Sequence, residues 1–191
     1  IDSDPLLKYL FSEGKMLGVL VCGKPDSEET VTLNAFSGLA GGHSVLPGFV
    51  PPIFDTTKVP SLRGHLSAAA PISSETASLR FGPTADAVPP LMVPRVAQVS
   101  EGTGAAAKQN SRELQDWLFR QYRVKNGLGE EKDIKDIFAA RGLVPPGGTG
   151  ECAAPKLLDY AFRNGLKPLC MGEFWYGASP GSGEVRQHGR F

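Results

Sequence analysis

The sequence lacks an excess of charge of either sign, and it lacks long apolar runs. Lysine plus arginine and aspartate plus glutamate both number 20 in a chain of 191 residues, so the formal net charge is zero. A balanced chain has no general attraction for nucleic acid or for a membrane surface, so RNA would have to bind at a local patch. No apolar run approaches the roughly 20 residues that span a bilayer, which predicts no transmembrane segment, and no signal-peptide pattern opens the chain.

Cysteine is scarce as well. The chain has three cysteines, Cys22, Cys152 and Cys170, and an odd, sparse set argues against a disulfide framework. This favours a reducing compartment, either the cytoplasm or the matrix or stroma of an organelle. The sequence opens on Ile1 and ends abruptly at Phe191, so we expect a processed product or a part of a longer protein.

Glycine and proline, in contrast, are abundant, with 23 and 16 residues. Their number predicts many turns and at least one irregular stretch. Residues 60–108 are rich in alanine, serine, proline and glycine and show little periodicity. We predict a long irregular insertion or linker there, which becomes ordered against a partner.

The patterns ahead of this insertion predict a helix, a β-hairpin and an apolar loop. Ser3-Asp4-Pro5 is a helix-start signal, with a capping side chain before a proline. Met16–Val21 is a continuous apolar run and Thr30–Phe36 alternates between apolar and polar residues, which together predict a β-hairpin. Two prolines within Phe49–Asp55 rule out a central strand, so we predict an ordered apolar loop.

Helices and a strand are predicted after the insertion. Asn110 and Glu113 have the spacing of a capping box, which indicates a helix start. Residues 1–59 and 109–191 are interpreted as one α/β domain, a β-hairpin plus helices packed on a small mixed sheet. The other predicted elements of its second part are a short helix from Asp133, a helix after the Gly-rich loop Gly147–Gly150 that ends at Asn164-Gly165, and a strand over Pro168–Gly177.

The Gly-rich loop and the cysteine that follows it are the first candidate site. Bare N–H groups and the dipole at a helix start favour an anion, although the pattern is neither a P-loop nor a dinucleotide fingerprint, and a plain turn is the alternative. At this helix entrance we expect Cys152 to have a lowered pKa. It could act as a nucleophile or metal ligand, or only pack. The candidate bases for a nucleophile are His43, His65 and His188, none at a diagnostic spacing.

Two further segments carry polar groups beside aromatic ones. Glu173 precedes Phe-Trp-Tyr and could supply an acid next to stacking surfaces, although aromatic residues in a strand are also typical of sheet packing. The tail Arg186–Arg190 could contact phosphate or form a solvated end. Cys22 and Cys170 lie in apolar strand contexts, where buried thiols are common.

Several motifs together resemble a known family. They are Gly-Glu-Cys-Ala-Ala-Pro-Lys-Leu-Leu, Gly-Leu-Lys-Pro-Leu, Glu-Phe-Trp-Tyr-Gly, Ser-Pro and Arg-x-His-Gly in the second half, and Leu-Gly-Val-Leu-Val, Ala-Phe-Ser-Gly and Phe-Val-Pro-Pro-Ile-Phe-Asp in the first. These segments resemble the extra domain found ahead of certain bacterial RluA-type RNA pseudouridine synthases. The resemblance covers roughly residues 10–55 and 110–191, and no segment matches the synthase domain with its catalytic aspartate.

That extra domain resembles the cytidine-deaminase-like fold, which has a β-hairpin, a helix headed by a zinc ligand, a strand, and a second helix headed by Pro-Cys-x-x-Cys. The analogy places Cys152 at the first zinc-ligand position. The acid-base glutamate of the deaminases would fall two residues later, where this chain has Ala154, and Glu151 is out of register. No cofactor is expected, and zinc is expected only if the paired cysteines follow Phe191.

The resemblance therefore implies a deaminase-like module without catalysis, because deamination needs both a bound zinc ion and a group that transfers protons. We expect this module to serve as an RNA-binding or scaffold domain. Two alternatives remain open: a structural subunit of a large organellar assembly such as a ribosome or a membrane complex, and a fragment of an RNA pseudouridine synthase. The predicted partners are RNA or a large protein assembly. The candidate binding surface comprises Gly148, Gly150, Glu151, Cys152, Lys156, Glu173, Trp175 and His188, with Cys152 as the candidate metal ligand.

Overall fold

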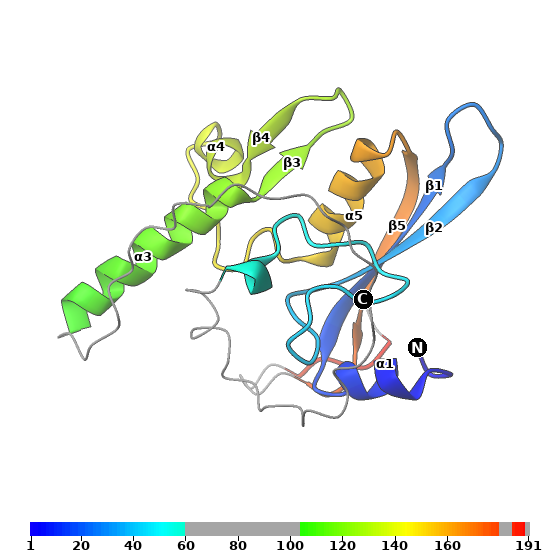
Figure 1. The fold of residues 1–191 in the computed structure, drawn as a ribbon, viewed down its shortest axis with the longest axis horizontal. Helices are drawn as coiled ribbons and strands as arrows, with labels where there is room; N and C mark the ends of the chain where they lie inside the picture. The colour runs from blue at the N-terminus through cyan, green and yellow to red at the C-terminus, as the bar shows by residue number, and fades with distance from the viewer. Residues whose placement is uncertain (60–103, 180–184, 190–191) are drawn as a thin grey trace.

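A computed structural model describes residues 1–59, 104–179 and 185–189. The described part is a mixed α/β structure with two small antiparallel sheets (Figure 1). The three-stranded sheet has the order β2-β1-β5 and consists of β1 (Lys15–Gly23), β2 (Thr30–Phe36) and β5 (Lys167–Tyr176). The other elements are α1 (Pro5–Leu10), η1 (Thr56–Lys58), α3 (Gly104–Gln121), β3 (Arg123–Lys125), β4 (Glu131–Asp133), α4 (Ile134–Ala139) and α5 (Ala153–Arg163).

The predicted hairpin is confirmed, but the predicted mixed sheet is not. β1 pairs with β2 in the register Leu20↔Leu33 and with β5 in the register Leu20↔Met171, and both pairs are antiparallel. β2 and β5 therefore run in the same direction, yet they lie on opposite sides of β1 and never become neighbours. Within the described residues the sheet is thus wholly antiparallel, because the connection through α5 skips over β1.

Local sequence signals explain where several helices begin. The Asp4 carboxylate accepts hydrogen bonds from the N–H groups of Leu6 and Leu7, which caps α1 as predicted. The Asp133 carboxylate caps α4 in the same way, through the N–H of Asp136 at 2.8 Å. α5 begins at Ala153, directly after the Gly-rich loop, as its apolar spacing predicted.

The helix predicted from Asn110 begins earlier, at Gly104. The capping-box residues thus lie inside α3, because the alanines at positions 105–107 are strong helix formers and extend the helix toward the N-terminus. Residues 104–108 belong to this helix rather than to the irregular insertion. The remainder of the predicted insertion, residues 60–103, lies outside the described residues.

Two separate apolar clusters pack on the two faces of the three-stranded sheet. On one face Leu17 and Phe36 pack with Phe11 and Tyr176, beside α1. On the other face the side chains of Leu20, Cys22 and Ala35 pack against Ala153, Leu157 and Ala161 of α5. Consecutive strand residues point to opposite faces, so the apolar run of β1 serves both clusters. The loop predicted over Phe49–Asp55 closes over them, with Val50 in the second cluster and Phe49 against the first.

A small second sheet, β3 with β4, was not predicted. Each of its strands has only three residues, too few for a pattern of alternation to show in the sequence. Next to it Phe119, Tyr122 and Ile134 form a third buried cluster with Phe54 against it. None of the described helices combines the length and apolar character needed to cross a membrane.

Gly18 allows α5 to lie close to β1. A Cβ atom at this position would come within 2.9 Å of both Ala153 Cβ and Leu157 Cδ1. Such a contact is closer than packed carbon atoms approach. The glycine therefore sets the distance between the central strand and the helix that carries the candidate site.

We expect Gly18→Val to lower the free energy of unfolding by about 1–3 kcal/mol through overpacking. Valine suits a strand, so a loss would reflect the clash rather than strand propensity. The matched control is Gly23→Ala on the same strand, where an added Cβ meets its nearest atom, of Leu169, at 4.0 Å. Urea unfolding of the three proteins decides, and equal stability of Gly18→Val and wild type would contradict the close-packing account.

Candidate functional site

The Gly-rich loop turns sharply ahead of α5. Gly148 and Gly150 both have positive φ, +79° and +101°, which favours glycine. At Gly150 a side chain is also excluded by space, because a Cβ would lie 2.6 Å from the Tyr122 ring. The loop therefore packs against the third cluster, and its glycines serve the turn.

Glu151 links this loop to two other parts of the chain. Its carboxylate accepts a hydrogen bond from the Tyr122 hydroxyl, and its carbonyl accepts one from the Gly38 N–H at 2.9 Å. The other carboxylate oxygen lies 3.9 Å from Lys156 Nζ. Burial and the neighbouring Glu151 carboxylate raise the pKa of Tyr122, so the phenol stays a hydrogen-bond donor.

Lys156 is a buried cation with several partners. Its side chain is only 2% exposed, and its ammonium donates to the carbonyls of Phe36 at 3.0 Å and Gly38 at 3.5 Å. The ammonium also lies 5.3 Å from the centre of the Phe36 ring, within the range of a cation–π contact. Burial lowers the pKa of Lys156, while Glu151 opposes this shift. The amine thus joins α5 to the end of β2 and to the Gly-rich loop.

Cys152 is the N-cap residue of α5, and its side chain makes no capping hydrogen bond. Although Cys152 is exposed as a residue, partial burial of its thiol, then the Glu173 carboxylate, raises its pKa, with a smaller contribution from Glu151, while Lys156 acts in the opposite direction. The predicted lowering of this pKa is therefore wrong. The sequence pattern pointed to the helix dipole alone, whereas the fold adds carboxylates that oppose the thiolate.

Glu173 approaches the same helix end from β5. Its carboxylate accepts a hydrogen bond from the Ala154 N–H at 3.1 Å. A negative charge from the protein itself already interacts with the positive end of the α5 dipole. This argues for the plain-turn interpretation of the Gly-rich loop over a site for an external anion.

We use the name helix-entrance site for Glu151, Cys152, Lys156 and Glu173 together. Trp175 and His188 from the predicted surface form a separate group at the end of β5. The Trp175 indole donates to the Ala178 carbonyl at 2.9 Å, and the ring lies 5.1 Å from the Arg186 guanidinium. The His188 ring packs on Tyr176 at 4.6 Å between ring centres and accepts the Gly177 N–H at 3.1 Å.

The described residues do not fit a zinc site. Zinc needs three or four protein ligands, and among the described residues no group of three histidine, cysteine or acidic side chains is placed to hold a metal. His43 lies exposed in a loop, and His188 is engaged with Gly177. Cys22 is buried, as predicted, but Cys170 is exposed, which corrects its predicted burial. The third candidate base, His65, lies outside the described residues.

Comparison with known proteins adds no relative. No protein-family model, no curated protein and no solved structure matches this chain. The resemblance of the motifs to the extra domain of the pseudouridine synthases therefore stays a prediction.

Tyr122 and Asp159 are site-shaping residues that the sequence did not single out. Tyr122 lies 29 positions from the Glu151 that it binds. Asp159 accepts a backbone hydrogen bond from Lys125, 34 positions away. No local spacing signals such contacts. The sequence offered one hint of such contacts, which is that Lys156 and Asp159 lie on the apolar side of a helix. Lysine and aspartate are rarely buried unless they are paired.

We expect Glu173→Gln to lower the pKa of Cys152, because the substitution removes a negative charge beside the thiol. Glutamine keeps an oxygen that can accept the Ala154 N–H. Alkylation of Cys152 by iodoacetamide, followed by peptide mass spectrometry across pH, should therefore reach its half-maximal rate at lower pH than in wild type. Glu29→Gln, at the tip of the β1–β2 hairpin, is the control, and an unchanged profile for Glu173→Gln would contradict the assigned electrostatics.

Proposed function

We propose that this chain is a non-catalytic, deaminase-like module that binds RNA, related to the accessory domain of RluA-type pseudouridine synthases. The observation that carries the proposal is at Ala154. The resemblance requires an acid-base glutamate there, and a methyl group cannot shuttle a proton. The Ala154 N–H instead binds the Glu173 carboxylate.

The order of elements supports the deaminase-like part of the proposal. The resemblance implies a hairpin, a helix headed by the candidate ligand, and a strand. The chain has β1 and β2, then α5 headed by Cys152, then β5 beside β1. This agreement in the order of elements supports a deaminase-like architecture. Whether the chain catalyses a reaction depends instead on its side chains.

The state of the carboxylates and the lysine supports the non-catalytic part. Glu151 is bound by Tyr122 and lies close to Lys156, and Glu173 caps α5. The Lys156 ammonium donates its hydrogen bonds to backbone carbonyls. Each charged group at the helix-entrance site has a structural partner, which is typical of a site retained for its shape. RNA is favoured as the partner because the related domain accompanies an RNA-modifying enzyme.

The experiment measures three properties of the same purified chain: metal content by mass spectrometry, deamination of cytidine and of cytosine in single-stranded RNA, and RNA binding by fluorescence anisotropy. We expect RNA binding without turnover. Stoichiometric zinc together with deamination that is lost in Cys152→Ala and in Glu173→Gln would overturn the proposal, because Glu173 would then act as the missing acid. The exposed Cys170→Ala is the matched control.

A further inference from the structure

A surface pocket lies at the opposite end of α5 from Cys152. Its volume is about 420 Å³, within the range of small-molecule sites. One wall is the turn between β3 and β4, and the other is the end of α5 with the turn into β5. Figure 1 shows where these two segments lie in the fold. We call it the hairpin pocket, and the lining residues used below are Lys125, Gly127, Leu128, Phe162, Gly165 and Lys167.

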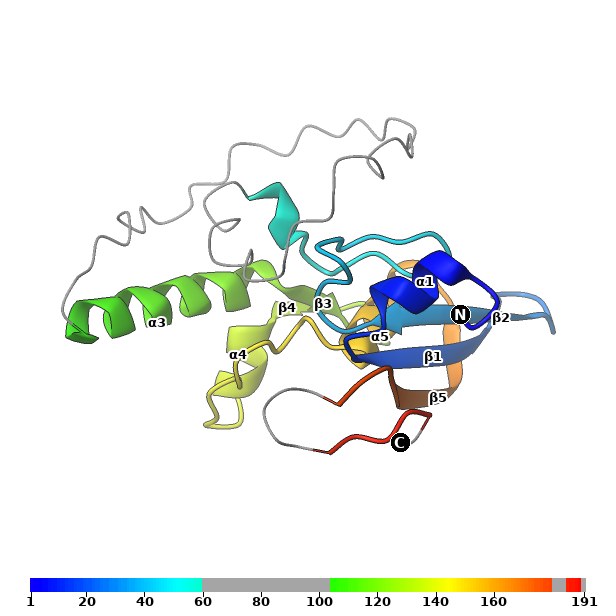
Figure 2. The ribbon, with the colours of Figure 1, turned by 90° about the horizontal axis from the view of Figure 1, so that it is seen from below.

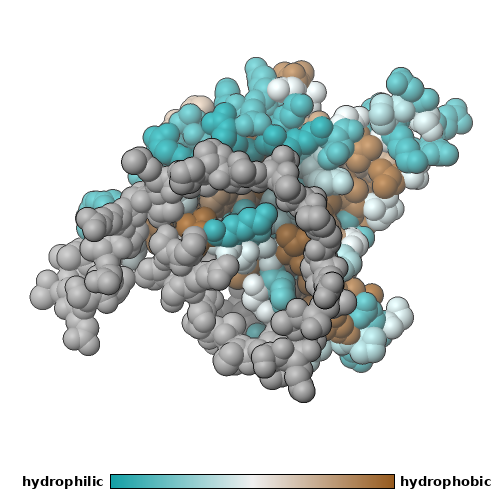
Figure 3. Space-filling view, viewed as in Figure 1, coloured by the Kyte–Doolittle hydropathy of each residue, from teal (hydrophilic) through white to brown (hydrophobic). Residues whose placement is uncertain are grey.

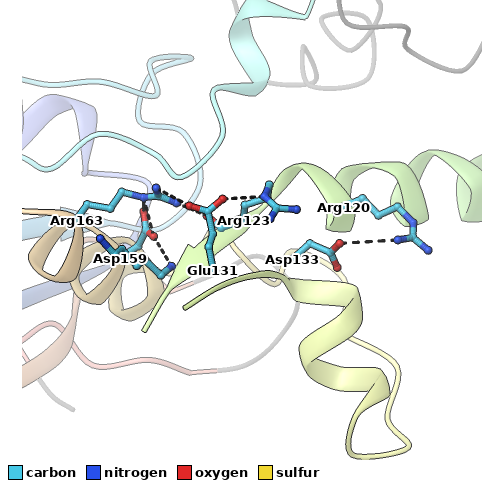
Figure 4. A network of polar contacts seen from close by, with 7 residues as sticks. Arg120, Arg123, Glu131, Asp133, Asp159 and Arg163 are labelled. Carbon is cyan, nitrogen blue, oxygen red and sulfur yellow. Dashed lines mark hydrogen bonds and ion pairs between the residues drawn. The ribbon is translucent and has the colours of Figure 1, made fainter. Parts of the chain in front are cut away.

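A polar network fixes the two walls relative to each other (Figure 4). Arg163 of α5 binds Asp159 on its own helix at 2.9 Å and Glu131 of β4 at 2.8 Å. Glu131 also accepts from Arg123 at 2.8 Å. The Lys125 N–H donates to Asp159 at 2.8 Å. The pocket is therefore held open by charge-assisted hydrogen bonds between its walls.

Glycines keep the pocket free of side chains. A Cβ at Gly127 would lie 3.3 Å from the Phe162 ring, so a larger residue would press on that ring. Gly129 and Gly165 have φ of +83° and +67°, a conformation that side chains disfavour. The Phe162 ring is thus the one aromatic surface among the lining residues, beside the aliphatic Leu128, Leu166 and Pro168.

Among residues 1–59, 104–179 and 185–189, the lysines of the pocket have no carboxylate partner. Neither Lys125 nor Lys167 forms an ion pair with another residue in the described part of the chain. The carboxylates nearby are already engaged: Glu131 and Asp159 by arginines, and Glu130 by the Asn126 amide. The pocket consequently offers positive charge that no carboxylate of the described residues neutralises.

Two apolar side chains of the pocket, Phe162 and Leu128, lie outside the core clusters, whereas Leu166 packs against the second cluster. Phe162 belongs to none of the buried clusters of the described residues. Leu128, at the tip of the turn, is 86% exposed. An aromatic ring beside lysines in an open pocket is the combination that binds single-stranded nucleic acid, because bases stack on the ring and phosphates meet the charges.

We propose that the hairpin pocket binds one nucleotide of a single-stranded RNA, with its base on Phe162 and Leu128 and its phosphates at Lys125 and Lys167. The inference rests on the proposed RNA-binding function and assigns it a place that the sequence motifs did not indicate. RNA is favoured over an acidic peptide because a peptide would use the lysines without needing a flat aromatic surface.

The test measures anisotropy of a labelled single-stranded RNA of about ten nucleotides with the full chain. The double variant Lys125→Glu/Lys167→Glu should weaken binding at least about tenfold, and it should reduce the slope of log K against log salt by about 1.4, near 0.7 per lost phosphate contact. The control Lys8→Glu/Lys58→Glu makes the same change of charge elsewhere and should have little effect. Equal losses in both double variants would overturn the proposal.

Phe162→Leu tests the stacking part. Leucine keeps an apolar side chain without a flat face, so binding should weaken about tenfold while the salt slope stays unchanged. Tight binding of a polyglutamate peptide that competes with RNA, with no effect of Phe162→Leu, would make the pocket a protein-docking site and overturn the RNA assignment.

The two proposals fail in different ways. If the wild type binds RNA and all pocket variants bind it equally well, the proposal for the hairpin pocket is wrong, but the proposed RNA-binding function stands. If the wild type binds no RNA, the proposed function fails. The pocket is then tested alone by NMR titration with a nucleoside monophosphate, where shifts of the Gly127 and Gly165 amides support it and their absence overturns it.

Discussion

The burial of one ammonium group, that of Lys156, is the constraint on which the candidate site depends. A buried charge is tolerated only when it is paired and hydrogen-bonded. Lys156 meets this condition by drawing the carbonyls of Phe36 and Gly38 and the carboxylate of Glu151 around one atom. The helix-entrance site therefore forms only when three segments pack together: the end of β2, the Gly-rich loop and α5.

The two ends of α5 serve different purposes as a result. At its N-terminal end every charged group has a structural partner, and burial of the thiol together with the Glu173 carboxylate raises the pKa of Cys152. At its C-terminal end Arg163 and Asp159 fasten the β3–β4 turn (Figure 4), and Figure 2 shows β3 and β4 next to α5 in a second view. The lysines of the hairpin pocket form no ion pair with described residues. The space-filling view shows hydrophilic residues over the β3–β4 region (Figure 3). The hairpin pocket, with its two unpaired lysines among the described residues, thus lies at the opposite end of α5 from Cys152.

Sequence patterns predicted the parts of the fold that depend on neighbouring residues. The hairpin, the caps at Asp4 and Asp133 and the start of α5 follow from local spacing. The β3–β4 sheet and the Tyr122–Glu151 contact were missed, because they join short or distant segments. The pKa of Cys152 was predicted with the wrong sign for the same reason, since the fold partly buries the thiol and brings Glu173 to it from β5. Apolar periodicity reports burial along one element and carries no information about which charges meet across elements.

The most direct test of this account is the free energy of unfolding of Lys156→Met, measured in urea beside Lys8→Met. Methionine fills a similar space but leaves the carbonyls of Phe36 and Gly38 without this donor and Glu151 without its ion-pair partner, so we expect a loss of about 2–3 kcal/mol. Lys8 lies on the exposed side of α1, and its substitution should change stability by no more than about 0.5 kcal/mol. A Lys156→Met protein as stable as wild type would show that the buried ammonium does not organise the helix-entrance site, which contradicts the central claim.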